Sequence, residues 1–482
     1  MCGVLGLLGH PEAKQIFPRV LLSLQHRGYD GAGVAGLVAQ NPDSIDTVKG
    51  VGKIPEIVND VSMSKFIGDR FIGHTRYSTR NESKSHREMH PHWAQAMMGR
   101  IAIVTNGDLL NVEQIRNHVQ GQKVKTYTSN DAEMMAALIN IELRQNGKDM
   151  MRAIQAAMQW TKGGFAALVM SEDDDHLYAF RDPWGIRPLH VCEFEMQGKK
   201  SVAVASETCA FDLIERYNLA SYDAASVKTK VRAVNPGEIL AIGPDAAMES
   251  ISFSGLRQQN IGCVFETIYF SRPDSRQNGE TFQSIRERMG AELYHERPVS
   301  ADLVTAVPKG GIPAAVGYAK ASGIPYSIAI LEEPTMGGLR SFIFNSNDRL
   351  PFARMKYNVL EDVVRGKRVV VIDDSIVRGT TLRLLIKSLW DKGAAEVHVR
   401  IPAPPYDHPC YYGIETKDPK TLISHGRTEE EVGRVLEASS LHYLSLEGLY
   451  QAIGKSRDLF CDECLSAKSP IQGADLAVRV SG

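Results

Sequence analysis

The chain has 482 residues, of which 43% are hydrophobic and 23% are charged, and its formal net charge is −2. This length predicts two or three domains with sizeable cores, and the balanced charge without a basic stripe excludes nucleic acid as an expected partner. The first residues lack the cationic and long apolar regions typical of a signal peptide, so we expect none; no stretch reaches about 18 apolar residues, and seven scattered cysteines favour a reducing compartment. We therefore expect a cytoplasmic protein that neither spans nor binds a membrane.

The first element in chain order is MCGVLGLLGH, in which Cys2 directly follows the initiator methionine. Methionine aminopeptidase removes Met1 when the next residue is small, so we expect the mature chain to begin at Cys2. An α-amine with a pKa near ~8 can accept the proton of a thiol with a pKa near ~8.5. This is the arrangement of an N-terminal nucleophile. The alternative is that Cys2 is only a small buried residue.

The rest of the first half predicts strands and helices in alternation. Residues 101–104 form an expected strand that ends at the turn TNGD, and residues 131–144 have the apolar spacing of a helix. Further strands are expected at 165–170 and 202–206, with the loop RDPWGIRPL between them, and residues 234–243 are expected to form a turn followed by a strand. The pattern loses its periodicity after residue 244, so we place a domain boundary near residue 255.

The second half has a different order of predicted elements, in which apolar strands are separated by helices of 10–15 residues. Such alternation predicts βαβ units and a parallel sheet that is buried on both faces. The segments in question are DLVTAVP, IPAAVGYAKAS, PYSIAIL, KRVVVIDD, TLRLLIKSLWDKG and AEVHVRIPAP.

The sharpest local signal is VVVIDDSIVRGTT at residues 369–381, where an apolar strand delivers two acids to a short loop. The paired acids Asp373 and Asp374 can hold the hydroxyls of a sugar directly or through Mg²⁺. The loop that follows offers hydroxyls and backbone N–H groups to an anion at a helix start. The residues assigned to this loop are Ser375, Arg378, Gly379, Thr380 and Thr381. The pattern indicates a ribose 5-phosphate ligand and resembles the phosphoribosyl pyrophosphate (PRPP) motif of type I phosphoribosyltransferases.

With a PRPP motif in the second half, the motifs of the first half can be interpreted as well. QHRGYDGAG, HTRYST, NGDLLN, RDPWGIRPL, ASETCA and NPGE together resemble the class II glutamine amidotransferase domain, an N-terminal-nucleophile hydrolase. Over residues 2–470 the chain resembles the glutamine PRPP amidotransferase family. The resemblance implies an α/β fold with an αββα sandwich at residues 2–255. It implies a doubly wound phosphoribosyltransferase domain with a C-terminal metal-cluster segment at residues 256–482.

The resemblance also implies a reaction and the residues that perform it. Cys2 hydrolyses glutamine through a thioester, and ammonia travels inside the protein to C1 of PRPP, from which Mg²⁺-pyrophosphate leaves. Asn106 and Gly107 are similar to the family's oxyanion hole. Arg76 matches the arginine that pairs with the glutamine carboxylate, and Asp131 matches the acid that receives its ammonium group. The remaining residues expected to shape this pocket are Arg27 and Thr79.

Four cysteines form a further pattern that the resemblance explains. One branch of the family binds a [4Fe–4S] cluster through cysteines in these contexts and in this order, and a structural Cys₄ zinc site is the alternative. The four residues are Cys263, Cys410, Cys461 and Cys464. The family also suggests a homo-oligomer, a tetramer or a dimer.

Several positions depart from the family pattern. Tyr29–Asp30 stands where Gln–Glu is usual, and Thr105 replaces the histidine before Asn106. The chain has VPKGG where the family usually has VPDSG. It has LEEPTMGGLRSF where the family has a cationic loop that closes over pyrophosphate, and Arg340 is the one residue of this segment expected to keep that closing role. Glu332 and Glu333 in this segment would repel a diphosphate instead of binding it. We therefore expect Lys309 and Gly310 of the VPKGG loop to hold the diphosphate. Two alternatives stay open: a paralogue that aminates another phosphosugar, and a non-catalytic regulatory homologue.

Overall fold

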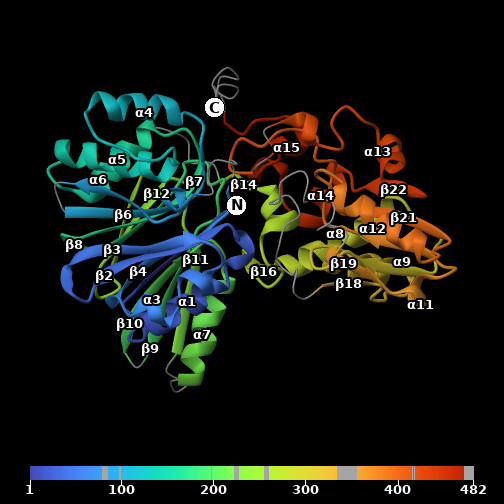
Figure 1. The fold of residues 1–482 in the computed structure, drawn as a ribbon, viewed down its shortest axis with the longest axis horizontal. Helices are drawn as coiled ribbons and strands as arrows, with labels where there is room; N and C mark the ends of the chain where they lie inside the picture. Colours follow the sequence, from blue (N-terminus) through green and yellow to red (C-terminus); the bar gives the residue numbers. More distant parts are fainter. Residues whose placement is uncertain are drawn as a thin grey trace. The chain divides into compact units, whose positions relative to one another are not determined.

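The computed structural model describes residues 1–78, 85–96, 99–196, 198–221, 227–253, 260–333, 355–414, 416 and 418–471. The chain forms two compact units (Figure 1). The first comprises Met1–Cys263 together with short segments that follow Cys410 and Ser469, and the second comprises Val264–Cys410 and Thr416–Ser469. The boundary predicted near residue 255 lies outside the described residues.

Two antiparallel sheets form the centre of the first unit. One sheet has the order β11-β9-β10-β1-β4-β2-β3, with β1 (Gly3–Leu8), β2 (Gly31–Val38), β3 (Asn41–Val51), β4 (Phe66–Arg76), β9 (His190–Met196), β10 (Lys199–Ala205) and β11 (Val227–Ala233). The other has the order β13-β12-β8-β7-β6-β5, with β5 (His92–Ala96), β6 (Gly99–Leu109), β7 (Gly163–Ser171), β8 (Asp174–Arg181), β12 (Glu238–Ile242) and β13 (Met248–Ser252).

Helices cover the outer face of each sheet. The first sheet is covered by α1 (Ala13–Leu22), α2 (Ile54–Ile57), α3 (Asp60–Met63) and α7 (Cys209–Ser221). The second is covered by α4 (Val112–Gly121), α5 (Asp131–Gln145) and α6 (Met150–Trp160). The Asn130 side chain begins α5 by accepting a hydrogen bond from the Ala132 nitrogen at 3.0 Å, and this cap fixes Asp131 in the first turn.

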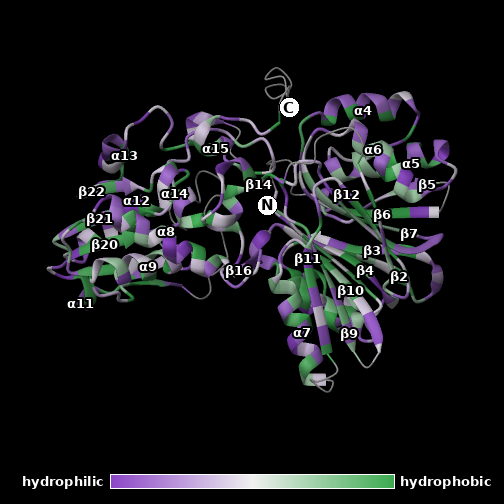
Figure 2. Ribbon diagram, turned by 180° about the vertical axis from the view of Figure 1, so that it is seen from behind, coloured by the Kyte–Doolittle hydropathy of each residue, from purple (hydrophilic) through white to green (hydrophobic). Residues whose placement is uncertain are grey.

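Strand β6 shows why these sequences form four layers. Ile101 and Ile103 pack against the helices, whereas Ala102 and Val104 pack between the two sheets. Successive residues of a strand point to opposite faces, so a strand with a core on both sides is apolar throughout. Figure 2 shows this concentration of hydrophobic residues along the strands of the first unit. The predicted αββα sandwich is confirmed.

The turn predicted at TNGD is wrong, because β6 continues through these residues to Leu109. Asn-Gly favours turns when glycine takes a positive φ. Gly107 does have φ +137°, but it stays opposite Phe165 in the β6–β7 ladder. Pairing with β7 therefore overrides the local turn preference and keeps Asn106 within a buried strand.

The second unit contains the predicted parallel sheet, with the order β17-β20-β21-β22. Its strands are β17 (Leu303–Ala306), β20 (Arg368–Ile372), β21 (Glu396–Ile401) and β22 (Ser440–Tyr443). The α-helices among its described residues are α8 (Phe282–Glu296), α9 (Ile312–Ser322), α11 (Glu361–Val364), α12 (Thr380–Asp391), α13 (Glu429–Leu436), α14 (Leu446–Ile453) and α15 (Glu463–Ser466). Because the strands are parallel, the segments after β17 and β20 emerge at the same sheet edge.

The segment PYSIAIL does not form the expected strand of the parallel sheet. Only its end belongs to a strand, β18 (Ile330–Glu332), which pairs antiparallel with β19 (Tyr357–Val359). Nearer its start, Tyr326 makes one isolated parallel bridge to Val304. The side chain of Ile328 is 58% exposed, so this part of the segment lacks the double-sided burial of a central strand. Strand β22 was not predicted.

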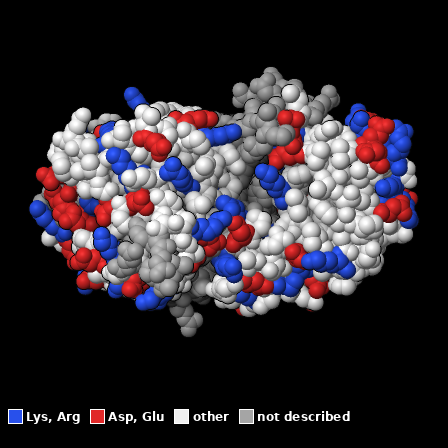
Figure 3. All heavy atoms as spheres, turned by 90° about the horizontal axis from the view of Figure 1, so that it is seen from below, with Lys and Arg blue, Asp and Glu red and all other residues white. Residues whose placement is uncertain are grey.

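Short strands complete the units, namely β14 (Gly262–Cys263) in the first and β15 (Arg276–Gln277), β16 (Glu280–Thr281) and β23 (Phe460–Cys461) in the second. Figure 3 shows cationic and anionic side chains interspersed on the face that it draws, in agreement with the small net charge. Within the described ranges, none of the helices combines the length and the apolar character needed to cross a bilayer.

Candidate active sites

Cys2 lies at the start of β1 and is held from several sides. Its side chain is almost fully buried, and its backbone nitrogen donates to Oδ1 of Asn106 at 3.1 Å. The Tyr77 nitrogen donates to Cys2 Sγ at 3.4 Å, and Sγ lies 3.6 Å from the Tyr77 carbonyl oxygen. These contacts fix both the nitrogen and the sulfur of Cys2. In the chain that retains Met1, that nitrogen is an amide, which is not basic, so only removal of Met1 creates a base there.

Arg27 is hydrogen-bonded to the backbone carbonyl of Cys2. The Arg27 side chain is fully buried, and its Nε donates to the Cys2 carbonyl oxygen at 2.8 Å. Its Nη1 lies 2.5 Å from Glu207 Oε1, which His26 Nε2 also contacts at 2.7 Å. A buried guanidinium requires such a partner, because an unpaired charge is costly away from water. Arg27 was predicted to shape the glutamine pocket, and the structure shows it bound to the backbone of the candidate nucleophile.

Asn106 and Gly107 lie on β6 beside Cys2. The Asn106 side chain is fully buried, and its Nδ2 has no hydrogen-bond partner among the described residues. Leaving a buried donor unsatisfied typically costs about 1–3 kcal/mol, so this amide is suited to an acceptor that a ligand supplies. A Cβ at Gly107 would lie 1.9 Å from the Gly164 carbonyl oxygen, and φ is +137°. Only glycine fits there.

Arg76 and Asp131 lie on different elements, and each contacts or adjoins a residue near Cys2 or Asn106. Arg76 ends β4 and directly precedes Tyr77, which contacts the Cys2 sulfur. Asp131 begins α5, and its Oδ2 accepts from the Leu109 nitrogen at 2.7 Å, three residues after Asn106. The Arg76 guanidinium donates from Nη1 to Nε2 of His90 at 3.1 Å. Thr79 lies outside the described residues.

Two acids that the sequence did not identify as site residues fix the surrounding backbone. Asp30 accepts from the Ser78 nitrogen at 2.8 Å, and its own nitrogen donates to the Arg76 carbonyl at 3.0 Å. Asp182 accepts from the nitrogens of Phe165 and Ile186, each at 3.1 Å, and burial raises the pKa of its carboxyl. The signal for both acids was present in the motifs QHRGYDGAG and RDPWGIRPL, but the hydrogen bonds join segments distant in sequence.

Sequence reasoning also did not identify Gly413, which belongs to the first unit although it comes late in the chain. A Cβ at Gly413 would lie 3.4 Å from the Cα of Gly107 and 3.0 Å from Nη2 of Arg187. The φ of Gly413 is +114°, which glycine alone adopts readily. Residues that follow Cys410 therefore pack directly against the predicted oxyanion hole.

In the second unit, Asp373 and Asp374 lie directly after β20, as predicted. The Asp374 nitrogen donates to Asp373 Oδ1 at 3.0 Å, and the Ser375 hydroxyl donates to Asp374 Oδ1 at 2.6 Å. Burial and the neighbouring Asp374 charge raise the pKa of the Asp373 carboxyl well above its usual range. Two close carboxylates resist joint ionisation unless a cation joins them. The donor set is that of a hard cation such as Mg²⁺, which prefers carboxylate oxygens.

The KGG loop lies directly against this acid pair. A Cβ at Gly310 would lie 1.7 Å from Asp374 Oδ2, so no larger residue fits without moving the carboxylate. Lys309 Nζ lies 3.8 Å from Glu332 Oε2, and Lys356 Nζ lies 3.8 Å from Glu332 Oε1. Glu332 is therefore paired with two lysines. Arg340 lies outside the described residues.

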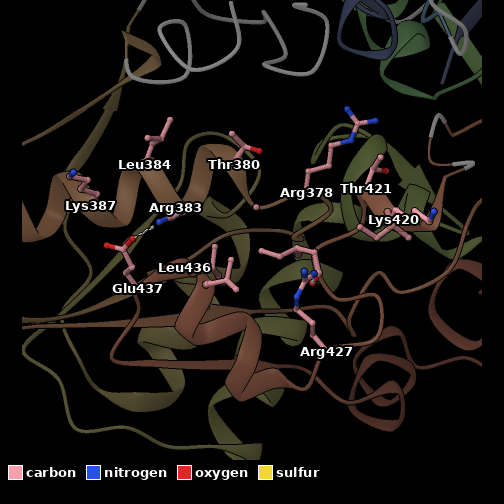
Figure 4. A pocket seen from close by; sticks show the side chains of 14 residues that line it. Arg378, Thr380, Arg383, Leu384, Lys387, Lys420, Thr421, Arg427, Leu436 and Glu437 are labelled. Atoms are coloured by element: carbon pink, nitrogen blue, oxygen red, sulfur yellow. Dashed lines mark hydrogen bonds and ion pairs between the residues drawn. The ribbon is translucent and has the colours of Figure 1, made fainter. Parts of the chain in front are cut away.

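A cationic pocket of about 480 Å³ adjoins the loop that follows the acid pair. It begins at Gly379, the left-handed N-cap of α12, and Arg383 in it is paired with Glu437 at 2.7 Å (Figure 4). Phosphate groups bind readily where a helix N-terminus and cations meet. The side chains that line the pocket are Arg378, Thr380, Arg383, Leu384, Lys387, Lys420, Thr421, Leu422, Ile423, Arg427, Val435, Leu436 and Glu437. Thr381 is the second residue of α12.

All seven cysteines are buried thiols that form no disulfide, and all seven lie in described ranges. In the second unit, the nitrogens of Asp407 and His408 each donate to the Cys464 carbonyl at 3.1 Å, which brings the Cys410 segment to the CDEC segment. The described residues contain no group of three or more His, Cys, Asp or Glu side chains able to hold one metal ion.

Comparisons with known proteins identify a domain of known type in each half of the chain. A glutamine amidotransferase domain family matches residues 74–212, and a phosphoribosyl transferase domain family matches residues 278–435. The chain is 40% identical to the amidophosphoribosyltransferase of Bacillus subtilis over 96% of its own length and 92% of that protein. It is 36% identical to the amidophosphoribosyltransferase of Archaeoglobus fulgidus over 98% of each chain.

Solved structures give the same result. The chain matches the glutamine PRPP amidotransferase of B. subtilis complexed with ADP and GMP, with a TM-score of 0.83, 38% identity and 97% coverage of each chain. It matches a structure described as the allosteric regulatory enzyme of purine biosynthesis with a TM-score of 0.84 and 38% identity, covering 98% of this chain and 97% of that one.

Proposed function

The chain belongs to the amidophosphoribosyltransferase family, and from this premise we propose which of its residues carry out the reaction. The enzyme transfers the amide nitrogen of glutamine to PRPP in purine biosynthesis, giving 5-phosphoribosylamine, pyrophosphate and glutamate. The first unit is proposed to be the glutaminase, and the second the phosphoribosyltransferase.

In the proposed glutaminase, the Cys2 sulfur attacks the amide carbon while the α-amine of the processed chain takes the thiol proton. The carbonyl oxygen becomes an oxyanion, which accepts hydrogen bonds from Asn106 Nδ2 and the Gly107 nitrogen. Ammonia leaves with that proton, and water then hydrolyses the thioester to glutamate. Arg76 receives the α-carboxylate and Asp131 the α-ammonium group. The observation that carries this proposal is the buried, unsatisfied Asn106 amide beside the Cys2 nitrogen.

In the proposed transferase site, ammonia attacks C1 of PRPP, the C1–N bond forms, and the C1–O bond to pyrophosphate breaks. Asp373 and Asp374 are proposed to hold the ribose hydroxyls and Mg²⁺, which supplies positive charge to the departing diphosphate when bound. Lys309 and the backbone of Gly310 face the diphosphate. The 5′-phosphate is assigned to the loop and helix start at Ser375, Arg378, Gly379, Thr380 and Thr381, where the cationic pocket begins.

The cluster and the assembly belong to the same proposal. Four buried thiols, two of them in CDEC, have the donor set of a [4Fe–4S] cluster, and we assign this role to Cys263, Cys410, Cys461 and Cys464. Thiols without disulfides fit a reducing cytoplasm. A homo-oligomer, either a dimer or a tetramer, is part of the proposal.

The test of the glutaminase assignment replaces the nucleophile alone. We expect intact mass to show that the active protein lacks Met1. Cys2→Ala should abolish glutamine-dependent synthesis and retain synthesis from ammonia, because the second site is untouched. Cys192→Ala, which removes a buried thiol from the core beneath the first sheet, is the matched control and should retain both activities. Retained Met1 in fully active protein would contradict the proposed base.

A further inference from the structure

Three buried histidines lie around Arg76, and none of them is among the residues assigned above. His74 lies on β4, His90 precedes β5 and His92 begins β5, and each is at most 4% exposed. The rings of His74 and His90 are stacked, with centroids 4.0 Å apart and an interplanar angle of 8°. The ring of His92 meets that of His90 edge-on at 4.9 Å. We call these three residues the histidine cluster.

Arg76 depends on the middle ring of the histidine cluster. Its Nη1 donates to His90 Nε2 at 3.1 Å, and no carboxylate in the described part of the chain forms an ion pair with Arg76. Its Nε is buried without a hydrogen-bond partner among the described residues. The guanidinium is therefore held by a neutral acceptor, and its charge stays available to an incoming anion. A carboxylate partner from the protein itself would compete with that anion.

The contact requires His90 to be uncharged. A guanidinium only donates hydrogen bonds, and an imidazolium has no acceptor left. A neutral ring has one acceptor, and although the Thr105 nitrogen also approaches Nδ1 at 3.4 Å, the shorter contact with the charged donor is the stronger.

The surroundings of His90 favour this neutral state. The titratable or charged groups that face it are His74, His92, Arg76 and Lys49. Burial and these neighbours lower the pKa of His90 well below its usual value of 6.5. Lys49 also fixes the backbone on both sides of the ring, because its Nζ donates to the carbonyls of Met89 at 2.6 Å and Pro91 at 3.1 Å.

We propose that His90 is a positioning residue for glutamine: as a neutral acceptor it orients the Arg76 fork toward the substrate α-carboxylate. The inference rests on the proposed role of Arg76. A carboxylate is bound best by two parallel N–H groups, so a guanidinium that rotates freely loses this geometry. Protonation of His90 removes the acceptor and places a second positive charge against Arg76. Glutamine binding should therefore weaken only as the pH falls well below 6.5, independently of the chemistry at Cys2.

The experiment compares His90→Gln, which keeps an acceptor that does not titrate, with His90→Leu, which keeps none. We expect His90→Leu to raise the KM for glutamine by about tenfold, because a hydrogen bond to a charged group is lost. Its kcat with ammonia should be unchanged, which shows that the chain is folded. His90→Gln should keep the KM within about threefold of wild type near pH 7.5.

The pH profile separates positioning from simple packing. Because the pKa of His90 lies well below 6.5, the two profiles should coincide above that pH; as the pH is lowered further, the KM of the wild type for glutamine should rise more steeply than that of His90→Gln, because only the wild type loses its acceptor. His92→Gln, the same change at a ring that is not hydrogen-bonded to Arg76, should keep the steeper, pH-dependent rise in KM, because the His90 ring is still present. Identical profiles for wild type and His90→Gln would overturn the inference, even if His90→Leu does not fold.

A further variant distinguishes failure of this inference from failure of the proposed function. Arg76→Leu should raise the KM for glutamine more than His90→Leu does. If Arg76→Leu leaves that KM unchanged, the carboxylate role of Arg76 is wrong, and the inference falls with it. If Arg76→Leu raises the KM and His90→Leu does not, only the positioning role of His90 is wrong.

Discussion

Asn106 performs two separable tasks in the proposed glutaminase, and two substitutions measure them. Oδ1 accepts from the Cys2 nitrogen at 3.1 Å, while Nδ2 is buried without a partner among the described residues. Asn106→Asp keeps the acceptor and replaces the donor, whereas Asn106→Ala removes both. Loss of one oxyanion donor costs about 2.7–4 kcal/mol, or 10²–10³-fold in kcat. Loss of the contact with the Cys2 nitrogen adds about 1 kcal/mol, roughly a further fivefold in Asn106→Ala.

The assay for Asn106 is glutamine hydrolysis measured beside synthesis from ammonia. We expect both variants to lose about 10²-fold or more in glutaminase kcat, with the KM for glutamine changed by less than about threefold. Synthesis from ammonia should stay at the wild-type level, and Thr105→Ser, one residue earlier on β6, serves as the control. If Asn106→Asp retains glutaminase kcat within about tenfold, Nδ2 is not an oxyanion donor and the assignment is refuted.

The other predictions concern the transferase site and the cluster. Gly310→Ala should reduce PRPP-dependent synthesis by roughly tenfold to a hundredfold and spare the glutaminase, because the new Cβ would lie 1.7 Å from Asp374 Oδ2; normal synthesis would contradict this. Lys309→Ala should raise the KM for PRPP by about tenfold or more, whereas Glu332→Gln should leave it unchanged or lower it, as steady-state kinetics can show. Protein purified without oxygen should contain about four irons and four sulfides per chain, and stoichiometric zinc without iron would exclude the cluster.

The parts of the structure that sequence reasoning predicted are those in which local pattern and function coincide. An apolar run that ends in Asp373 and Asp374 can be recognised as a central parallel strand, because both of its faces are buried and its acids follow at once. The helix at residues 131–144 was also predicted correctly, since its apolar spacing and the preceding Asn130 cap are local properties. Such elements carry their own boundary signals in the sequence.

The missed features depend on pairing between distant segments. The Asn106–Gly107 pair carries a turn signal, yet β7 lies beside it and extends the strand. Asp182 and Gly413 reach Phe165 and Gly107 only after the sheets and the late segment have assembled. No spacing rule connects such positions, because the contact is set by tertiary packing rather than by the period of a helix or strand.

The positions that depart from the pattern of the resembled family have identifiable contacts in the structure. Thr105, which the resemblance places where a histidine is usual, accepts at its carbonyl from His74 Nε2 at 2.9 Å, and its nitrogen lies 3.4 Å from His90 Nδ1, so two other imidazoles lie around this position. In the second unit, the unusual Lys309 lies 3.8 Å from the unusual Glu332. A new acid beside a diphosphate site is unfavourable alone, but a lysine nearby balances it and remains able to exchange that partner for phosphate, because Lys309 is largely exposed. Lys309 is therefore best understood together with Glu332, and Lys309→Ala alone should weaken PRPP use more than Lys309→Ala combined with Glu332→Gln.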